Sequence, residues 1–313
     1  MTPDCGPARV IAVDLGGTWL RAATFDEKGG IVRRAAVATE RSRGPLGIVD
    51  QIDSLVRQVG GSHYEAPSKR KVVVIGVPGT VNPATGVVLV AANLPGWHDV
   101  PLKQMLETKT GYECLVEHDA NLAALAEYRR WTVRAVAHFA YVTVSTGIGA
   151  GLVFDGHLYR GGTGSAGEFG HMVAVMDGPL CRCGNQGCLD AVASGSAIAR
   201  MAGADSAEDV ARAAAAGDEP SRLVLAVAAR HLGIALGGLI NLLNLDAVAL
   251  GGGVFGAGDM YWDSVMAAVA EASFVSTRQH CRFTRAQLGG DQGLVGAFEL
   301  AHHCLASSQD VAP

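Results

Sequence analysis

Three of the seven cysteines in this 313-residue chain fall in the short stretch CRCGNQGC, as Cys181, Cys183 and Cys188, and His171 precedes them. Thiolates and an imidazole are ligands that Zn²⁺ prefers, and three Cys with one His complete a tetrahedral set. The odd number of cysteines disfavours disulfides, and so does the reducing compartment inferred below. The pattern therefore predicts a structural zinc site with no open position for activating water.

Two glycine turns resemble each other, VDLGGTWLR at 13–21 and VSTGIGAGL at 144–152. Each joins two predicted strands, and turns of this kind expose backbone N–H groups that can cradle phosphate oxygens. Thr18 and Thr146 could add hydroxyl donors, and Asp14 could hold Mg²⁺ through water. The alternative reading of either turn alone is an ordinary hairpin.

Two other phosphate motifs were considered. The chain has no G-x-x-x-x-G-K-[ST], which excludes a P-loop protein. A G-x-G-x-x-G match at Gly162, Gly164 and Gly167 follows no clear strand and opens no obvious helix. We therefore do not interpret it as a dinucleotide site.

Asp119, in VEHDANLAALAE, lies where a predicted strand ends and a helix begins. Aspartate is common there as a helix N-cap. A carboxylate at the carboxyl end of a strand in an α/β protein is also well placed to act as a general base. The residue alone leaves both roles open.

The composition is that of a globular protein, with 49% hydrophobic and 18% charged residues and a net charge of −5. The negative charge argues against nucleic-acid or membrane-surface binding. We expect no signal peptide and no membrane span, and we infer a cytoplasmic protein. The length suits about two domains.

Hydrophobic patterning predicts two similar halves. The first has strands at 9–16, on both sides of the turn 26–30, at 71–79 and at 112–119, with helices at 45–59, 101–111 and 120–131. The second has two strands around the second glycine turn, helices over 196–217 and 220–243, and a strand at 246–250 that leads into three glycines.

This order predicts an α/β protein of two lobes. We expect a small N-terminal lobe at 1–117 and a large lobe at 118–291 that carries the zinc loop. A last helix at about 292–313 could pack back on the first lobe.

Seven stretches agree, in order, with one family: Asp14-Leu-Gly-Gly-Thr18, Asn93-Leu-Pro-Gly-Trp97, Asp119-Ala-Asn121, Ser145-Thr-Gly-Ile-Gly-Ala-Gly151, Glu168-Phe-Gly-His171, Cys181-x-Cys183-Gly-x-x-Gly-Cys188 and Leu250-Gly-Gly-Gly253. The chain resembles the ROK family of repressors, open reading frames and sugar kinases, close to bacterial glucokinases, over about residues 9–300. The zinc segment is the most specific of these motifs. The first glycine turn is shared with the wider actin and hexokinase group.

The resemblance implies two ribonuclease-H-like lobes with a central cleft, an actin/hexokinase-like fold. It also implies an ATP-dependent kinase acting on the 6-hydroxyl of glucose or a closely related sugar, with ATP, Mg²⁺ and structural Zn²⁺ as cofactors. Asp119 would be the general base. A homodimer is expected, with sugar and ATP as small-molecule partners.

The remaining roles are likewise implied by the resemblance. Asn93, Glu168 and His171 would bind sugar hydroxyls, and His171 would use its two ring nitrogens for zinc and sugar. Phosphate contacts would come from Gly16, Gly17, Thr18, Thr146 and Gly147, and adenosine contacts from Gly252 and Gly253.

Two positions depart from the family pattern, and both belong to the implied sugar shell. His118 stands where the family usually has Asn, and Asp190 where it usually has Glu. A changed polar contact shifts sugar preference. One interpretation is a sugar altered at C3 as the alternative substrate, such as kanosamine, in a biosynthetic pathway. The other is that His118 is a tolerated, solvated substitution and glucose is the substrate.

Two further classes were weighed. Sugar-sensing repressors of the family carry an N-terminal DNA-binding module, for which we expect no room before the strand at Val10. A catalytically silent sugar-binding protein is disfavoured because Asp119 and both glycine turns are present.

Overall fold

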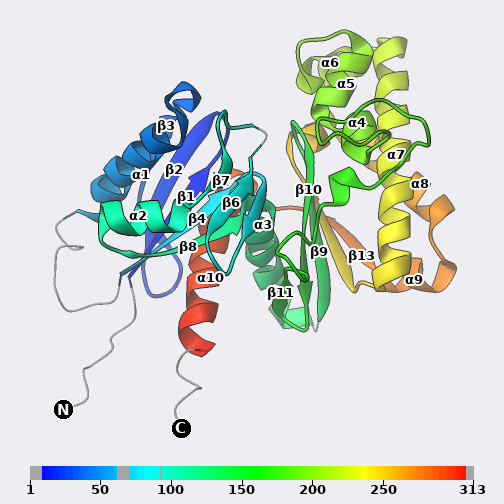
Figure 1. Cartoon of the computed structure of the whole chain (residues 1–313). Helices are drawn as coiled ribbons and strands as arrows, with labels where there is room; N and C mark the ends of the chain where they lie inside the picture. Colours follow the sequence, from blue (N-terminus) through cyan, green and yellow to red (C-terminus); the bar gives the residue numbers. More distant parts are fainter. Residues whose placement is uncertain (1–8, 62–70, 92, 135, 308–313) are drawn as a thin grey trace. The chain divides into compact units, whose positions relative to one another are not determined.

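The computed structural model describes residues 9–61, 71–91, 93–134 and 136–307. The described residues divide into two compact units. The first comprises those within 1–126, 160–166 and 290–313, and the second comprises 127–159 and 167–289. Figure 1 labels the helices and strands of both units.

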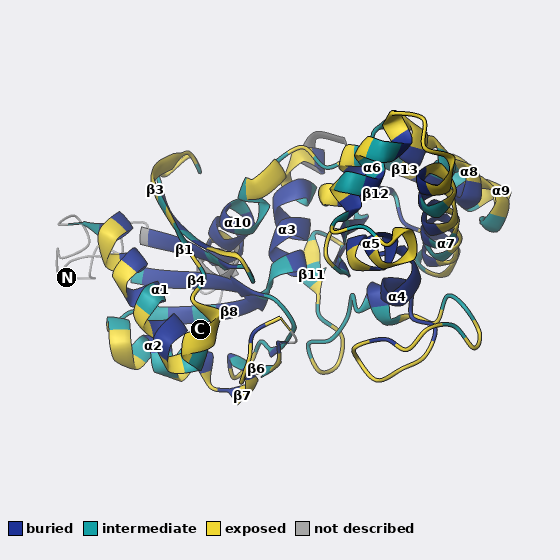
Figure 2. Cartoon of the chain, turned by 90° about the horizontal axis from the view of Figure 1, so that it is seen from above, coloured by how far each residue is buried: buried dark blue, intermediate teal, exposed yellow. Residues whose placement is uncertain are grey.

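The first unit is built on a five-stranded sheet of order β3-β2-β1-β4-β8. Its strands are β1 (Arg9–Leu15), β2 (Trp19–Phe25), β3 (Ile31–Ala38), β4 (Lys71–Val77) and β8 (Glu113–His118). The first three strands form an antiparallel meander, and β4 and β8 run parallel to β1. Strands β1, β4 and β8 are largely buried, as Figure 2 shows.

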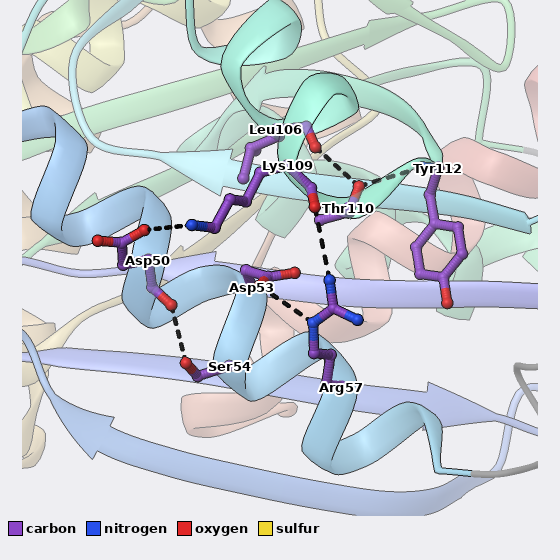
Figure 3. A network of polar contacts seen from close by, with 8 residues as sticks. All are labelled: Asp50, Asp53, Ser54, Arg57, Leu106, Lys109, Thr110 and Tyr112. Atoms are coloured by element: carbon purple, nitrogen blue, oxygen red, sulfur yellow. Dashed lines mark hydrogen bonds and ion pairs between the residues drawn. The ribbon is translucent and has the colours of Figure 1, made fainter.

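Helices and a small second sheet complete this unit. The helices are α1 (Gly44–Gly60), α2 (Leu102–Thr110), α3 (Asp119–Tyr128) and α10 (Gln292–Ser307), with short 3₁₀ turns η1 (Arg41–Arg43) and η6 (Gly289–Asp291). The small antiparallel sheet contains β5 (Thr80–Asn82), β6 (Val87–Val90) and β7 (His98–Val100). An ion pair and hydrogen bonds join α1 to α2, and Asp53–Arg57 lies within that network (Figure 3).

The second unit repeats the topology of the first in a sheet of order β11-β10-β9-β12-β13. Its strands are β9 (His138–Val144), β10 (Ile148–Phe154), β11 (His157–Tyr159), β12 (Ala247–Gly251) and β13 (Arg282–Arg285). An antiparallel meander is again followed by two parallel strands. This repeated order is the ribonuclease-H-like arrangement that the sequence led us to expect.

The helices of the second unit follow in chain order. They are η3 (Arg129–Arg134), η4 (Phe169–His171), α4 (Leu189–Ala193), α5 (Gly195–Ala202), α6 (Ala207–Ala215), α7 (Glu219–Leu243), η5 (Gly253–Ala257), α8 (Asp259–Ala272) and α9 (Val275–His280). Helix α7 is long and apolar enough to cross a membrane, because it contains an 18-residue stretch with a mean hydropathy of 1.9. Half of that stretch is buried in the folded chain. Its Gly233 packs directly against α8, because a Cβ there would lie 2.5 Å from Ala268 Cβ. We therefore interpret α7 as a core helix.

The compact units divide the chain differently from the boundary expected at 117/118. Helix α3 follows β8 without a loop and stays with the first unit. There α10 packs directly on it, because a Cβ at Gly296 would lie 1.8 Å from the carbonyl oxygen of Leu122. Close backbone contact thus places the C-terminal helix on the first unit, the packing that the sequence left open.

Candidate active site

Two carboxylates of the first unit stand at the same end of its sheet. Asp14 pairs with Gly76 in β4, and Gly76 pairs with Glu117 in β8, two residues before Asp119. All three strands are parallel here. Asp14 and Asp119 therefore stand near the carboxyl ends of β1 and β8, the two strands that flank β4, and open α/β sheets bind ligands at this edge.

Asp14 is the carboxylate whose acidity the fold changes most. Burial, reinforced by the negative charge of Asp119, raises the pKa of Asp14 to about 6, although Arg21 acts in the opposite direction. Arg21 Nη1 lies 3.2 Å from Asp14 Oδ2. A carboxylate that is destabilised in this way would gain from a bound cation, which fits the Mg²⁺-binding role expected from the sequence.

Asp119 does not have the geometry of a helix N-cap. Its Oδ1 accepts the N–H of the next residue, Ala120, at 2.7 Å, whereas a capping side chain accepts from a residue two or three positions further on. The side chain remains 43% exposed. Asp119 is therefore not an N-cap, and its role as a general base stays a prediction.

His118 lies directly beside Asp119, with its Nε2 atom 3.3 Å from Asp119 Oδ1. Asn93 belongs to the same neighbourhood as the first glycine turn, because a Cβ placed on Gly17 would lie 3.7 Å from Asn93 Cβ. The structure thus pairs His118 with Asp119 and, separately, Asn93 with the first glycine turn.

The first glycine turn is a tight hairpin connection. Gly16 donates its N–H to the carbonyl of Trp19 at 2.8 Å, and Thr39 Oγ1 donates to the carbonyl of Gly16 at 2.8 Å. The Gly16 amide therefore closes the turn. The phosphate-binding role expected for this segment is then left to the amides of Gly17 and Thr18 and to the Thr18 hydroxyl.

The second glycine turn, in the second unit, lies next to the triple-glycine turn. Gly253 donates its N–H to Ser145 Oγ at 3.2 Å. A Cβ on Gly252, whose φ is +96°, would lie 2.2 Å from the carbonyl oxygen of Val144, so only glycine fits there. This proximity brings together Thr146, Gly147, Gly252 and Gly253, all four of the residues that the sequence assigned to ATP in this unit.

Asp190 is hydrogen-bonded to the backbone of the second glycine turn. It is buried, and its Oδ1 accepts the N–H of Ile148 at 2.7 Å. A Cβ on Gly147 would lie 2.9 Å from the same oxygen. One carboxylate oxygen of Asp190 is therefore committed to the turn, while its sugar-binding role stays a prediction.

The sequence-predicted zinc ligands converge. The ligand atoms of His171, Cys181, Cys183 and Cys188 all lie within 4.8 Å of one another. Cys183 Sγ is 3.6 Å from Cys188 Sγ, and Cys181 Sγ is 3.7 Å from His171 Nδ1. Tetrahedral zinc with bonds of about 2.3 Å to sulfur places neighbouring ligands roughly 3.7 Å apart, so the four residues fit the ion.

The fold also changes the acidity of a buried thiol in this cluster. Burial, together with the neighbouring thiols, raises the pKa of Cys188 to about 12. A bound metal ion reverses this effect and holds cysteines as thiolates. The cluster would therefore bind metal in exchange for protons.

His171 connects the thiol cluster to the expected sugar ligands. While its Nδ1 faces Cys181, its Nε2 lies 3.8 Å from Glu168 Oε2. The two ring nitrogens thus face different partners, which is the arrangement needed if one serves zinc and the other a substrate.

The G-x-G-x-x-G match at Gly162, Gly164 and Gly167 directly precedes Glu168. It follows β11, a three-residue strand antiparallel to β10, and leads into the single turn η4. No parallel crossover follows it, so it is not a dinucleotide fingerprint. Gly164 instead permits a close approach, because a Cβ there would lie 2.6 Å from the carbonyl oxygen of Val81.

Sequence reasoning did not assign a role to Glu117 or Arg160. Glu117 is buried, and its Oε2 accepts a hydrogen bond from Arg160 Nε at 2.7 Å. The available signal was its position. Glu117 lies near the carboxyl end of a predicted strand and directly precedes the candidate site residues His118 and Asp119. Its partner could not be identified from sequence, because 43 positions separate the two residues.

Comparison with known proteins shows the family of this chain. It belongs to the ROK family, which it matches over residues 10–304. It is 33% identical over 307 residues to the glucokinase of Halalkalibacterium halodurans, with 91% of this chain and 92% of that one covered. It is 34% identical over 298 residues to the N-acetylmannosamine kinase of Escherichia coli, with 93% and 97% covered.

A solved structure agrees with the sequence comparison. The ROK family glucokinase of Streptomyces griseus, in complex with glucose and AMPPNP, is 34% identical to this chain. The superposition has a TM-score of 0.80 and covers 95% of this chain and 100% of that one. Both the family and the fold class expected from the sequence are confirmed.

Proposed function

We propose that this protein transfers the γ-phosphoryl group of ATP to the 6-hydroxyl of glucose or a closely related sugar, with Asp119 as the general base. The observation that carries the proposal is the position of Asp119. Its half-exposed carboxylate stands at the carboxyl end of β8, on a chain that is one-third identical to glucokinases along nearly its whole length. The class of enzyme, an ATP-dependent sugar kinase, rests on the family and its named relatives.

Asp119 would accept the proton of the sugar hydroxyl as that oxygen attacks the γ-phosphorus. A sugar alcohol is a very weak acid, so proton transfer is coupled to attack and the carboxylate acts through its position. Phosphoryl transfer otherwise requires charge neutralisation. Asp14 is the residue that would hold Mg²⁺, which would offset the charge on the transferring phosphates.

The phosphate and adenosine contacts would come from two glycine-rich segments. In the first unit, Gly17 and Thr18 would contact phosphate, while Gly16 contributes by closing the turn. In the second unit, Thr146 and Gly147 would contact phosphate, with Gly252 and Gly253 beside them for the adenosine. Exposed amides in such turns bind anions without adding charge of their own.

The sugar shell would comprise Asn93, His118, Glu168, His171 and Asp190. A zinc ion held by the three cysteines and His171 Nδ1 would fix the orientation of that ring, so that Nε2 and the Glu168 carboxylate could meet sugar hydroxyls. The zinc is structural in this proposal because four protein ligands leave no open position.

A modified sugar such as kanosamine is the second candidate substrate. His118 supports it, since an imidazole beside the base replaces the amide usual in the family. A neutral imidazole has one donor and one acceptor nitrogen, whereas an amide has an acceptor oxygen and a two-donor NH2 group, so the two side chains would meet an amino group at C3 differently.

The outer face of α7 supports the expected homodimer. Leu223, Val227 and Ile234 recur on one side of the helix and are 67%, 39% and 42% exposed. An apolar stripe of this kind suits burial against a second copy. A cytoplasmic location, also part of the proposal, fits an enzyme that uses ATP.

Release of ADP by the purified protein with ATP and Mg²⁺ tests the substrate. The panel is glucose, mannose, fructose, glucosamine, N-acetylmannosamine and kanosamine. Highest kcat/KM on glucose supports the first proposal, and highest kcat/KM on kanosamine supports the second. Turnover confined to N-acetylmannosamine or fructose would contradict both.

A further inference from the structure

Glu117 is a buried carboxylate whose three hydrogen bonds surround the point where β8 becomes α3. Its Oε1 accepts the N–H of His118 at 2.9 Å and the side-chain amide of Asn121 at 2.9 Å. Its Oε2 accepts from Arg160 at 2.7 Å. Both oxygens of the Glu117 carboxylate are therefore hydrogen-bonded, and they fix the turn between β8 and α3 that carries Asp119.

Arg160 begins a segment that is fixed to the first unit. The N–H of Ala166 returns to the carbonyl of Arg160 at 3.1 Å, which closes residues 160–166 into a loop. Gly164 of this loop approaches β5 so closely that a Cβ would lie 2.6 Å from the carbonyl oxygen of Val81. The Arg160 guanidinium is thus positioned beside Glu117 by a loop that packs against the first unit through Gly164.

The charge of Glu117 requires this partner. The Glu117 side chain is only 3% exposed, whereas that of Arg160 is 31% exposed. A buried carboxylate is strongly destabilising when its counter-charge is removed. Without Arg160, the buried Glu117 carboxylate would lack its counter-charge, and its bonds to His118 and Asn121 would be disturbed.

We propose that Glu117 and Arg160 are positioning residues for the catalytic base. Arg160 holds the Glu117 carboxylate in place, and Glu117 fixes the strand-to-helix turn from which Asp119 projects. This inference rests on the proposed role of Asp119. It assigns no substrate contact to either residue, so its effect should fall on kcat more than on the KM values.

The test compares Arg160→Met, Arg160→Lys, Glu117→Gln and the double variant Glu117→Gln/Arg160→Met. We expect Arg160→Met to lower kcat on the best sugar by about 10- to 100-fold, since small displacements of a catalytic group have effects of this size. Arg160→Lys keeps the charge and should retain more activity than Arg160→Met.

The double variant gives the sharpest prediction. Glutamine at 117 can still accept the two bonds made by Oε1 but carries no charge, so it no longer needs the guanidinium. Adding Glu117→Gln to Arg160→Met should therefore raise kcat. If Arg160 served stability alone, Arg160→Met would lower Tm and not kcat, and adding Glu117→Gln would leave kcat unchanged.

Arg57→Met is the matched control. Arg57 pairs with Asp53, another buried carboxylate of the same unit, at 3.1 Å (Figure 3). It also donates to the carbonyl of Lys109, near the end of β8 that is opposite to His118. This variant should lower Tm and leave kcat within about twofold of the unmodified protein.

The two proposals fail in different ways. If the unmodified protein shows no sugar-dependent ADP release, the proposed function fails. If Asp119→Asn is inactive but Arg160→Met has the kcat of Arg57→Met, only the positioning role is overturned. A double variant no more active than Arg160→Met also overturns it. Should Arg160→Met not fold, Arg160→Lys and the double variant decide: both near Asp119→Asn in activity contradicts the inference.

Discussion

The Nε2 atom of His118 lies 3.3 Å from Oδ1 of Asp119, so the one departure from the family pattern next to the base is in contact range of the base itself. An imidazole nitrogen at this distance is close enough to share a hydrogen bond with the carboxylate. Where a neutral amide is usual, this chain carries a group that can also accept a proton.

The first prediction concerns sugar preference. If His118 contacts the substituent at C3 of the sugar, His118→Asn should raise kcat/KM on glucose relative to kanosamine. The reason is that the C3 amino group of kanosamine would lose its partner, and an unpaired buried polar group costs ~1–3 kcal/mol. His98→Asn, at an exposed position, is the control. An unchanged ratio between the two sugars would remove His118 from the specificity shell.

The second prediction concerns zinc. The purified protein should contain about one zinc per chain, and Cys183→Ser should lose it and lower Tm. Cys183 is exposed, so its substitution would be tolerated if it did not bind metal. Gln186→Ser, also exposed and in the same loop, should keep both metal and Tm. A metal-free preparation with full activity would refute the zinc site.

The third prediction uses the acidity of Asp14. Its pKa is raised from 3.8 to about 6 in the folded chain, chiefly by burial and then by Asp119. Between these values the folded state binds more protons than the unfolded state. The stability that Asp14 contributes is therefore present below about pH 4 and is lost as pH rises through about 6.

Asp14→Asn should accordingly raise the free energy of unfolding at pH 7.5 by roughly 1–3 kcal/mol, and the gain should shrink as pH is lowered to 5. The same variant should lose activity if Asp14 binds Mg²⁺. Asp259→Asn, whose side chain is 92% exposed, should show no such pH-dependent gain. Equal or lower stability of Asp14→Asn at pH 7.5 would be inconsistent with the raised pKa.

The fourth prediction concerns assembly. Ile234→Glu places a charge in the apolar stripe of α7 and should convert a dimer to a monomer, measured by light scattering. Leu46→Glu changes a more exposed apolar residue, 74% exposed, on the first unit and should leave the dimer intact. A protein that is monomeric before any substitution would exclude the proposed interface.

Long apolar runs made much of the fold predictable. Residues 71–77 form an internal strand as expected, because burial on both faces of a sheet leaves a continuous apolar run. Residues 220–243 fall within α7, as the sequence predicted. The strands of the small sheet were missed, since three or four residues are too few for a period to show. Strand β13, with the sequence RFTR, was missed because it is a polar edge.

The site was predictable where its residues are near one another in sequence. The zinc ligands come from one short segment, and spacing alone brought them together. Asp190 is different, because its bond to Ile148 joins residues 42 positions apart and commits an oxygen that the sequence had assigned to sugar. Contacts of this kind depend on how strands and helices pack, which no local pattern records.

The most direct measurement is formation of sugar 6-phosphate from ATP by the unmodified protein and by Asp119→Asn, with equal Tm values as the check on folding. We predict turnover by the unmodified protein and a loss of about 10²–10⁴-fold in kcat for Asp119→Asn, the usual contribution of a general base. Near-normal activity of Asp119→Asn would contradict the central claim that this carboxylate takes the proton of the sugar.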